Sequence, residues 1–164
     1  MSGRASQGSK AGHQLRFGTR HPEQLAPLAS ELGASAGTPE EAVAFAEAVL
    51  LAVPLKAVPD LARSARFSGK VILDAANAYS QRDGKLAQDA LAHAGGSSAW
   101  VAEKLAGARV VKAFNSVNSR TLASEAHRKG DRSPSHSRAT TQTRCASPSN
   151  WCATPDSSLW WWAR

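Results

Sequence analysis

Polar side chains able to bind a phosphate stand directly after the first apolar run of the chain. The run Gln14–Gly18 is followed by Thr19, Arg20 and His21, which supply a hydroxyl, a guanidinium and an imidazole but no carboxylate. A guanidinium can hold a phosphate through two parallel hydrogen bonds. In a dinucleotide-binding α/β fold, an acid at this position suits the 2′-hydroxyl of NAD, whereas basic groups suit the 2′-phosphate of NADP. The sequence therefore favours NADP, and the alternative is that Arg20 is an ordinary surface arginine.

A second group of candidate residues closes the most apolar run of the sequence, Ala48–Pro54. If this run is a strand, Ala52, Val53 and Pro54 lie at its carboxyl end, where open α/β sheets bind their ligands. Their backbone groups could then line a cofactor. The alternative is structural: the run belongs to the core, and Pro54 ends the strand. The core assignment holds in both cases, and a cofactor role would be additional.

Two asparagines follow the next two apolar runs. Asn77 comes after Lys70–Ala75, and Asn115 comes directly after Arg109–Phe114. Both would stand at the same edge of a parallel sheet, where ligand sites gather, and the Asn115 amide could hydrogen-bond a nicotinamide or a substrate carbonyl. Asparagine is also common in the turns that follow strands, so a turn role is the alternative for each residue.

The sequence shows neither a catalytic triad nor a general-base pair. Its histidines are scattered, and the spacing of Cys145 and Cys152 matches no usual zinc site, so we predict no metal site and two free thiols. Hydride transfer requires none of these groups, because the cofactor performs the chemistry and the protein orients it.

The order of the apolar and amphipathic runs predicts the fold that would position these residues. Runs that are apolar on both faces are typical of parallel strands covered by helices, and here they alternate with helical patterns. Thr38 is a predicted helix N-cap with proline and two acids after it, and Ser35–Gly37 is a predicted minimal strand. Helices are expected at Pro22–Leu32, Lys56–Ala65, Ser98–Leu105 and Ser119–Lys129. The sequence therefore predicts an α/β fold with a parallel sheet.

Charge and composition exclude several classes of partner. The chain has 164 residues, a length suited to one domain, and a net charge of +7 at pH 7. The excess lies at the two ends, because residues 22–132 are nearly neutral. A basic arm of this kind does not by itself predict nucleic-acid binding. No apolar run is long enough to span a membrane, and the start MSGRASQGSKAGH lacks the apolar segment of a signal peptide, so we expect a cytoplasmic protein with neither nucleic-acid nor membrane partners.

The segment 133–164 differs from the rest of the chain. It holds four of the five tryptophans, three of them consecutive at 160–162, and it has neither helical nor strand periodicity. One interpretation is a disordered tail. The other is out-of-frame translation beginning near Arg132, because three consecutive TGG codons, read from the preceding third base, encode three valines. Sequencing the gene distinguishes the two, since an open frame with unrelated codons would exclude the second.

Several short motifs in a fixed order resemble one protein family. They are KAGH, FGTRHPEQL, GTPEEA, VLLAVPLKAVPDL, VILDAANAYSQRDG and VVKAFNSVNSRTL, and they extend over about Lys10 to Arg132. This order and spacing are similar to those of the deazaflavin-dependent NADP oxidoreductases and their dinucleotide-binding relatives. The resemblance implies a Rossmann domain that binds NADP and, in characterised relatives, exchanges hydride with the deazaflavin coenzyme F420.

The resemblance also implies roles for individual residues. Thr19 and Arg20 would hold the 2′-phosphate. The nicotinamide side would be lined by Ala52, Val53 and Pro54. Asn77 and Asn115 would face the hydride-transfer cleft.

The beginning of the chain departs from the family pattern. The family opens with an apolar strand and a G-x-G-x-x-G turn, which lets the backbone approach the pyrophosphate, whereas this chain begins MSGRASQGSKAGH. In the Rossmann strand order 3-2-1-4-5-6 the first strand is central, so without it the second and fourth strands have unpaired edges. We therefore expect a Rossmann-like sheet with flanking helices that lacks its first strand. The expected boundaries are 1–132 for an incomplete NADP-binding domain and 133–164 for a disordered or out-of-frame tail.

Three functions remain open on these grounds. The first is an oxidoreductase domain that passes hydride between NADP(H) and a deazaflavin or similar acceptor, with small-molecule partners and a homo-oligomer left open. The second is an inactive fragment of such an enzyme with little affinity for NADP. The third is a binding module that uses its basic, tryptophan-bearing tail.

Overall fold

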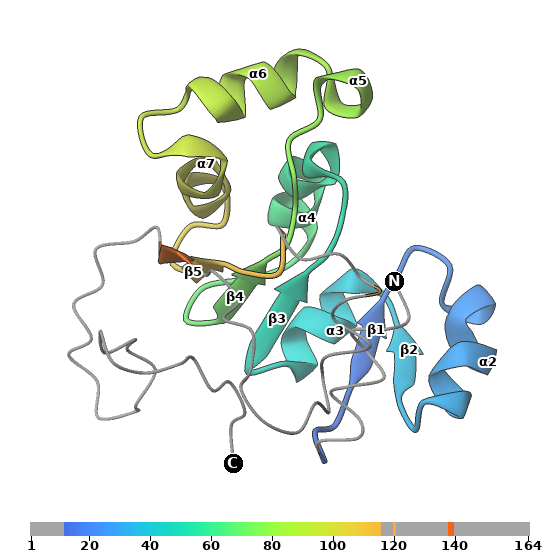
Figure 1. Cartoon of the computed structure of the whole chain (residues 1–164). Helices are drawn as coiled ribbons and strands as arrows, with labels where there is room; N and C mark the ends of the chain where they lie inside the picture. The colour runs from blue at the N-terminus through green and yellow to red at the C-terminus, as the bar shows by residue number, and fades with distance from the viewer. Residues whose placement is uncertain (1–11, 116–119, 121–137, 140–164) are drawn as a thin grey trace, which may run out of the picture.

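A computed structural model describes residues 12–115, 120 and 138–139 of the chain (Figure 1). Six strands and seven helical segments lie in this part. The strands are β1 (Arg16–Gly18), β2 (Ser35–Gly37), β3 (Ala48–Leu51), β4 (Val71–Asp74), β5 (Arg109–Lys112) and β6 (Arg138–Ala139). The helices are α2 (Pro22–Glu31), α3 (Pro39–Phe45), the 3-10 turn η1 (Leu55–Ala57), α4 (Val58–Ser64), α5 (Ser80–Asp83), α6 (Lys85–Ala92) and α7 (Gly96–Lys104).

The strands form two sheets. A helical crossover joins β1 to β2, β3 to β4 and β4 to β5. β1 pairs with β2 in parallel, and β3, β4 and β5 pair in parallel in that order. The register of the larger sheet places Ile72 of β4 between Val49 of β3 and Val110 of β5. Parallel strands linked by helices define an α/β fold, so the predicted fold class is confirmed.

β1 lies between β2 and β3 in Figure 1, but it pairs only with β2. In the part of the chain that the structure describes, no strand pairs with the edge of β1 that faces β3 or with the facing edge of β3. These two strands correspond to the second and fourth strands of the Rossmann order. The expected pair of unpaired edges is therefore present among the described residues.

Local sequence explains why the small sheet and α3 pack together. The Thr38 hydroxyl accepts a hydrogen bond from the Glu41 backbone N–H at 3.2 Å, and the Glu41 carboxylate accepts from the Thr38 N–H at 3.1 Å. This capping box confirms the predicted helix start. At Gly18, a Cβ would lie 3.0 Å from the Ala42 Cβ and 3.2 Å from the Pro39 Cα, so glycine lets α3 approach β1 closely.

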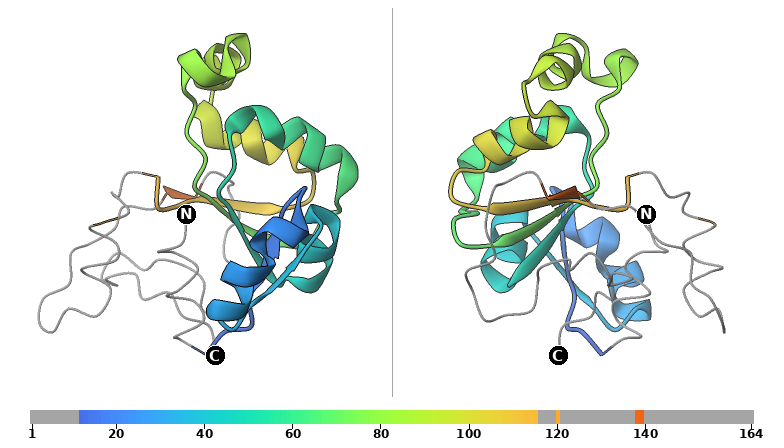
Figure 2. Two further views of the ribbon diagram at one scale, coloured as in Figure 1. Left: turned by 90° about the vertical axis from the view of Figure 1, so that its right-hand side faces the viewer. Right: turned by 60° about the vertical axis from the view of Figure 1, so that its left-hand side comes forward.

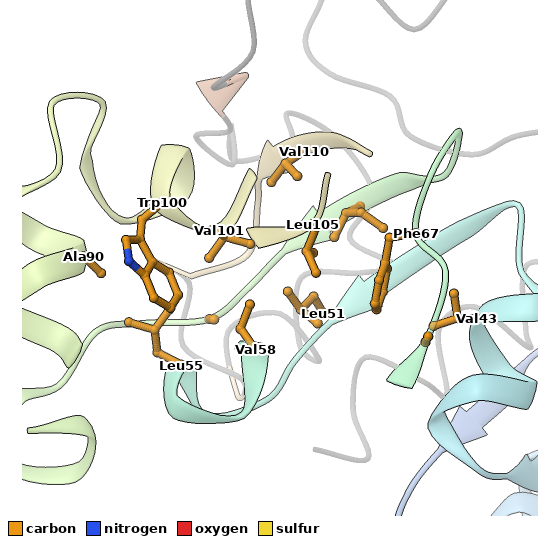
Figure 3. Close-up of a cluster of buried hydrophobic side chains, with 13 residues drawn as sticks. Val43, Leu51, Leu55, Val58, Phe67, Ala90, Trp100, Val101, Leu105 and Val110 are labelled. Atoms are coloured by element: carbon orange, nitrogen blue, oxygen red, sulfur yellow. The ribbon is translucent and has the colours of Figure 1, made fainter. Parts of the chain in front are cut away.

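The hydrophobic core lies between the larger sheet and the two helices that cover one of its faces. Figure 2 shows α4 and α7 together over that face. Leu55, Val58 and Val101 contribute side chains from η1, α4 and α7 that are fully shielded from solvent, and Trp100 packs beside them (Figure 3). Ile72 and Val110 meet them from the sheet. The core therefore fixes the strands whose carboxyl ends hold most of the candidate residues.

Several elements differ from the prediction. The expected helix Lys56–Ala65 begins with a 3-10 turn, and pairing of the expected strand Ala48–Pro54 ends at Leu51. α5 and α6 were not predicted. The segment 133–164 was expected to lack regular structure, but Arg138–Ala139 form β6, which pairs antiparallel with β5. This strand could not be predicted from the sequence, because it depends on pairing with β5 and the segment itself has no strand periodicity. The predicted helix Ser119–Lys129, apart from residue 120, and the rest of the tail with Cys145 and Cys152 lie outside the described residues.

None of the helices in the described ranges is long and apolar enough to cross a membrane.

Candidate functional site

The candidate residues lie immediately beyond the carboxyl ends of four strands. Thr19, Arg20 and His21 follow β1, and Ala52, Val53 and Pro54 follow β3. Asn77 and Asn115 follow β4 and β5. Because β3, β4 and β5 are parallel neighbours, the last five of these residues belong to loops at one edge of one sheet. This is the edge at which open α/β sheets bind ligands.

The two asparagines are hydrogen-bonded to each other. The Asn77 Nδ2 donates to the Asn115 carbonyl oxygen at 3.2 Å, and the Asn115 Nδ2 donates to the Asn77 Oδ1 at 3.4 Å. Both residues are half-buried. The structure therefore brings together two residues that are 38 positions apart in the sequence. Each amide nitrogen has a second hydrogen, so the pair can still donate to a ligand.

A strained residue precedes Asn115. Phe114 has a φ of 62°, the only positive φ at a non-glycine residue in the described part of the chain. A bulky residue in this left-handed region is uncommon and costs about 1 to 3 kcal/mol. Strain of this kind persists where the surroundings impose it, and here it turns the chain at the end of β5 so that Asn115 meets Asn77.

A buried ion pair joins the ends of β4 and β5, three residues before each asparagine. Asp74 and Lys112 are register partners on β4 and β5, and the Lys112 Nζ lies 3.0 Å from the Asp74 Oδ2. The same Nζ donates to the Ala76 carbonyl, while the Asp74 Oδ1 accepts from the Ala76 N–H at 2.9 Å. The Asp74 side chain has no solvent exposure and also accepts from the Ser98 hydroxyl at 3.4 Å. The pair therefore ties both strand ends to the backbone that leads to Asn77.

Sequence reasoning missed this ion pair, although a signal was present. Asp74 and Lys112 each interrupt the end of an apolar run, with opposite charges. Once the two runs are taken as neighbouring parallel strands, opposite charges at matching positions indicate a pair, because an unpaired buried charge is strongly unfavourable.

The loop after β3 combines packing with exposure. Val53 packs against the core, whereas Ala52 is half-buried and Pro54 is exposed. The Pro54 carbonyl accepts from the Ala57 N–H at 2.9 Å and thereby starts η1. The core assignment therefore applies to Val53, whereas the strand ends at Leu51, before Pro54.

The segment after β1 is organised separately. The Thr19 hydroxyl accepts from the His21 N–H at 3.2 Å, and the His21 Nδ1 lies 3.4 Å from the Glu23 carboxylate. Arg20 is exposed, and within the described residues no ion pair joins it to an acidic side chain. No described hydrogen bond or ion pair links this segment to the three loops of the larger sheet.

A family model matches the part of the chain that contains three of these four segments. Residues 2–78 match the model of a family described as NADP oxidoreductase, coenzyme F420-dependent. The predicted resemblance is confirmed over this segment. It contains the candidate residues that follow β1, β3 and β4, and it supports an oxidoreductase-type domain that binds NADP. A comparison with curated proteins finds no match.

Solved structures with the same fold include three proteins from different organisms. A hypothetical protein from Sinorhizobium meliloti is 27% identical, with a TM-score of 0.59 over 76% of this chain and 60% of its own. A candidate F420-dependent NADP reductase from Arthrobacter sp. FB24 is 20% identical, with a TM-score of 0.57 over 73% of this chain and 60% of its own. A reductive aminase from Aspergillus terreus, in complex with NADPH and ethyl levulinate, is 22% identical, with a TM-score of 0.50 over 73% of this chain and 39% of its own. The chain thus spans 60% of the first two structures.

Proposed function

We propose that the chain is an NADP-binding oxidoreductase domain that passes hydride between NADP(H) and a deazaflavin or similar acceptor. The observation that carries this proposal is the family match over residues 2–78, which includes three of the four candidate segments. The fold supports it, because each segment follows the carboxyl end of a parallel strand. The similar reductase from Arthrobacter and the NADPH-bound aminase are consistent with this class of chemistry.

The segment after β1 fits the adenosine end of NADP. Arg20 is exposed and has no acidic partner among the described residues, so its guanidinium can accept a phosphate without breaking an ion pair. The Thr19 hydroxyl can donate to the same group while it accepts from the His21 N–H. The resemblance implies that Thr19 and Arg20 hold the 2′-phosphate, and we include His21 because its N–H closes this turn.

The asparagine pair and the loop after β3 fit the nicotinamide end. The remaining amide hydrogens of Asn77 and Asn115 can donate to the carboxamide oxygen, and the loop Ala52–Pro54, in which Pro54 is exposed, follows the neighbouring strand β3. When bound, NADPH would donate a hydride, which is one proton with two electrons, and oxidised NADP would accept one in the reverse direction. The chain's own residues would bind and orient the ring, and the separate proton that completes reduction of a deazaflavin can come from solvent.

A fluorescence titration with NADPH and NADH tests the proposal. We expect a dissociation constant for NADPH in the micromolar range and weaker binding of NADH, because only NADPH carries the 2′-phosphate. Oxidation of NADPH in the presence of oxidised coenzyme F420 then tests the acceptor. Absence of NADPH binding up to millimolar concentration would contradict the proposal.

One observation favours a second candidate, an inactive fragment with little affinity for NADP. The facing edges of β1 and β3 are unpaired among the described residues, so the two halves of the candidate site stand on separate sheets. The same titration distinguishes the two candidates. The third candidate, a binding module, depends on the basic tail, which apart from Arg138–Ala139 lies outside the described residues.

A further inference from the structure

Asp83 is a buried carboxylate outside the residues considered so far. It is the last residue of α5, and its side chain has no solvent exposure. Gly84 follows with a φ of 59°, a conformation that glycine adopts without strain, and allows the chain to turn into α6. In Figure 1, α5 lies beyond the end of the sheet, at the top of the long segment that leaves β4.

The two oxygens of Asp83 accept hydrogen bonds from three different sources. Oδ1 accepts from the backbone N–H of Lys56 at 3.3 Å, and Oδ2 accepts from the backbone N–H of Tyr79 at 3.2 Å. The Arg82 guanidinium donates to both oxygens, at 3.1 Å from Nε to Oδ1 and 2.7 Å from Nη2 to Oδ2. Both carboxylate oxygens of Asp83 are therefore fully engaged by donors of the chain itself.

These contacts join two loops of the candidate site. Lys56 stands two residues after Pro54, in the turn that follows β3. Tyr79 stands two residues after Asn77, in the loop that follows β4. The Arg82 Nη2 also donates to the Asn77 carbonyl oxygen at 2.6 Å. One carboxylate and its arginine thus link the backbone beyond Pro54 with the backbone of Asn77.

The link extends to the third loop. Asn77 is hydrogen-bonded to Asn115 beyond β5, so a displacement of the Asn77 backbone would move both ends of the asparagine pair. Asp83 is ionised at neutral pH, because hydrogen bonds from Arg82 lower the pKa of this carboxyl to about 2. The link is therefore intact throughout the neutral pH range.

We propose that Asp83, together with Arg82, is the positioning residue of the cofactor site, which sets the separation between the Pro54 loop and the asparagine pair. This inference rests on the proposed function. Asp83 acts through Arg82 and through the backbone of Lys56 and Tyr79, and it does not contact the cofactor. If the Pro54 loop and the asparagine pair were displaced by about 1 Å relative to each other, much of the binding or catalytic effect would be lost.

The test compares Asp83→Asn with Asp60→Asn. Both substitutions remove one carboxylate charge from an aspartate–arginine pair, but Asp60 is exposed and pairs with Arg63 on α4. We expect Asp83→Asn to weaken NADPH binding by at least tenfold and Asp60→Asn to leave it unchanged within twofold. Hydrogen exchange without cofactor provides the second readout: Asp83→Asn should speed exchange of the Lys56 and Tyr79 amides, and Asp60→Asn should not.

Arg82→Ala keeps the test decisive if Asp83→Asn does not fold. This variant leaves the two backbone hydrogen bonds to Asp83 in place but removes the Arg82 contacts with Asp83, with the Asn77 carbonyl and with the Tyr79 ring. We therefore expect a severalfold loss of NADPH affinity and a smaller change in Lys56 exchange than in Asp83→Asn. Normal NADPH affinity in Asp83→Asn or in Arg82→Ala would overturn the positioning role. Failure of the wild-type chain to bind NADPH would overturn the proposed function itself, so the two failures are distinguishable.

Discussion

Arg20 and Asp83 are charged residues with opposite environments, and the difference indicates what each can do. Arg20 is exposed and has no acidic partner among the described residues, whereas Asp83 is buried and accepts five hydrogen bonds. An exposed, unpaired guanidinium can bind an anion at little cost in desolvation. A buried carboxylate surrounded by protein donors is committed to structure. The first is therefore suited to ligand binding and the second to positioning.

Replacing Arg20 should reduce discrimination between NADPH and NADH. Loss of a charge-assisted hydrogen bond costs about 1.5 to 3 kcal/mol, so Arg20→Ala should weaken NADPH binding by about tenfold to a hundredfold and leave NADH binding unchanged. Parallel titrations with the two cofactors measure this. Arg66→Ala is the matched control, because Arg66 is also exposed but precedes β4, at the opposite edge of the sheet. An equal loss for both cofactors would argue against the assignment of the 2′-phosphate to Arg20.

The stabilising contribution of Asp83 should disappear in acid. Hydrogen bonds from Arg82 lower its pKa from 3.8 to about 2 in the folded chain, so the unfolded chain binds the proton more readily. The contribution is thus complete above about pH 4 and is lost as the pH falls through about 2. Urea unfolding of wild type and Asp83→Asn at a series of pH values checks this. The difference in their free energies of unfolding should be constant at neutral pH and shrink in acid; a difference that is the same at both ends contradicts the assignment.

Among the helices and strands, those whose start is determined by neighbouring residues could be predicted from the sequence. The start of α3 was predicted correctly because the Thr38 capping box is complete within four residues, and the short strand β2 before it was also predicted. By contrast, α5 is a single turn, and the carboxylate that ends it is bound to Lys56, 27 residues away. Nothing in its own sequence shows that contact. The loops that hold Asn77 and Asn115 were predicted, but their direct pairing depends on sheet order, which only the folded chain reveals.

The ion pair between Asp74 and Lys112 should stabilise the alignment of β4 with β5. Lys112→Met removes the cation and leaves the fully buried Asp74 carboxylate without a charged partner, which costs about 3 to 5 kcal/mol. Urea unfolding monitored by far-ultraviolet circular dichroism measures the loss. Lys85→Met is the control, because Lys85 is exposed at the start of α6 and should change stability by less than about 0.5 kcal/mol. Adding Asp74→Asn to Lys112→Met should restore part of the stability; a further loss would mean that Asp74 has another role.

For the whole molecule, the main structural feature is that the described strands form two separate sheets, which leaves two strand edges unpaired among the described residues. In a parallel ladder, alternate residues direct their backbone groups to the same side. The Leu15 and Gly37 carbonyls are used between β1 and β2, and those of Glu47 and Leu51 between β3 and β4. The backbone groups of Arg16, Gly18, Ala48 and Leu50 therefore point to the edges that are unpaired among the described residues. Such edges are templates for pairing with another chain.

We therefore expect the chain to self-associate through β3 as its concentration rises. Leu50 is 38% exposed on that strand, and a lysine there should oppose edge-to-edge pairing without removing a core side chain. Sedimentation velocity over a concentration series should show association for wild type and a clear reduction for Leu50→Lys. Leu91→Lys is the control, since Leu91 is 57% exposed but lies on α6, away from the strand edges. If NADPH binding brings the β1 end and the larger sheet into one site, it should also reduce association. Equal association of wild type and Leu50→Lys would mean that the edge of β3 is not the contact surface.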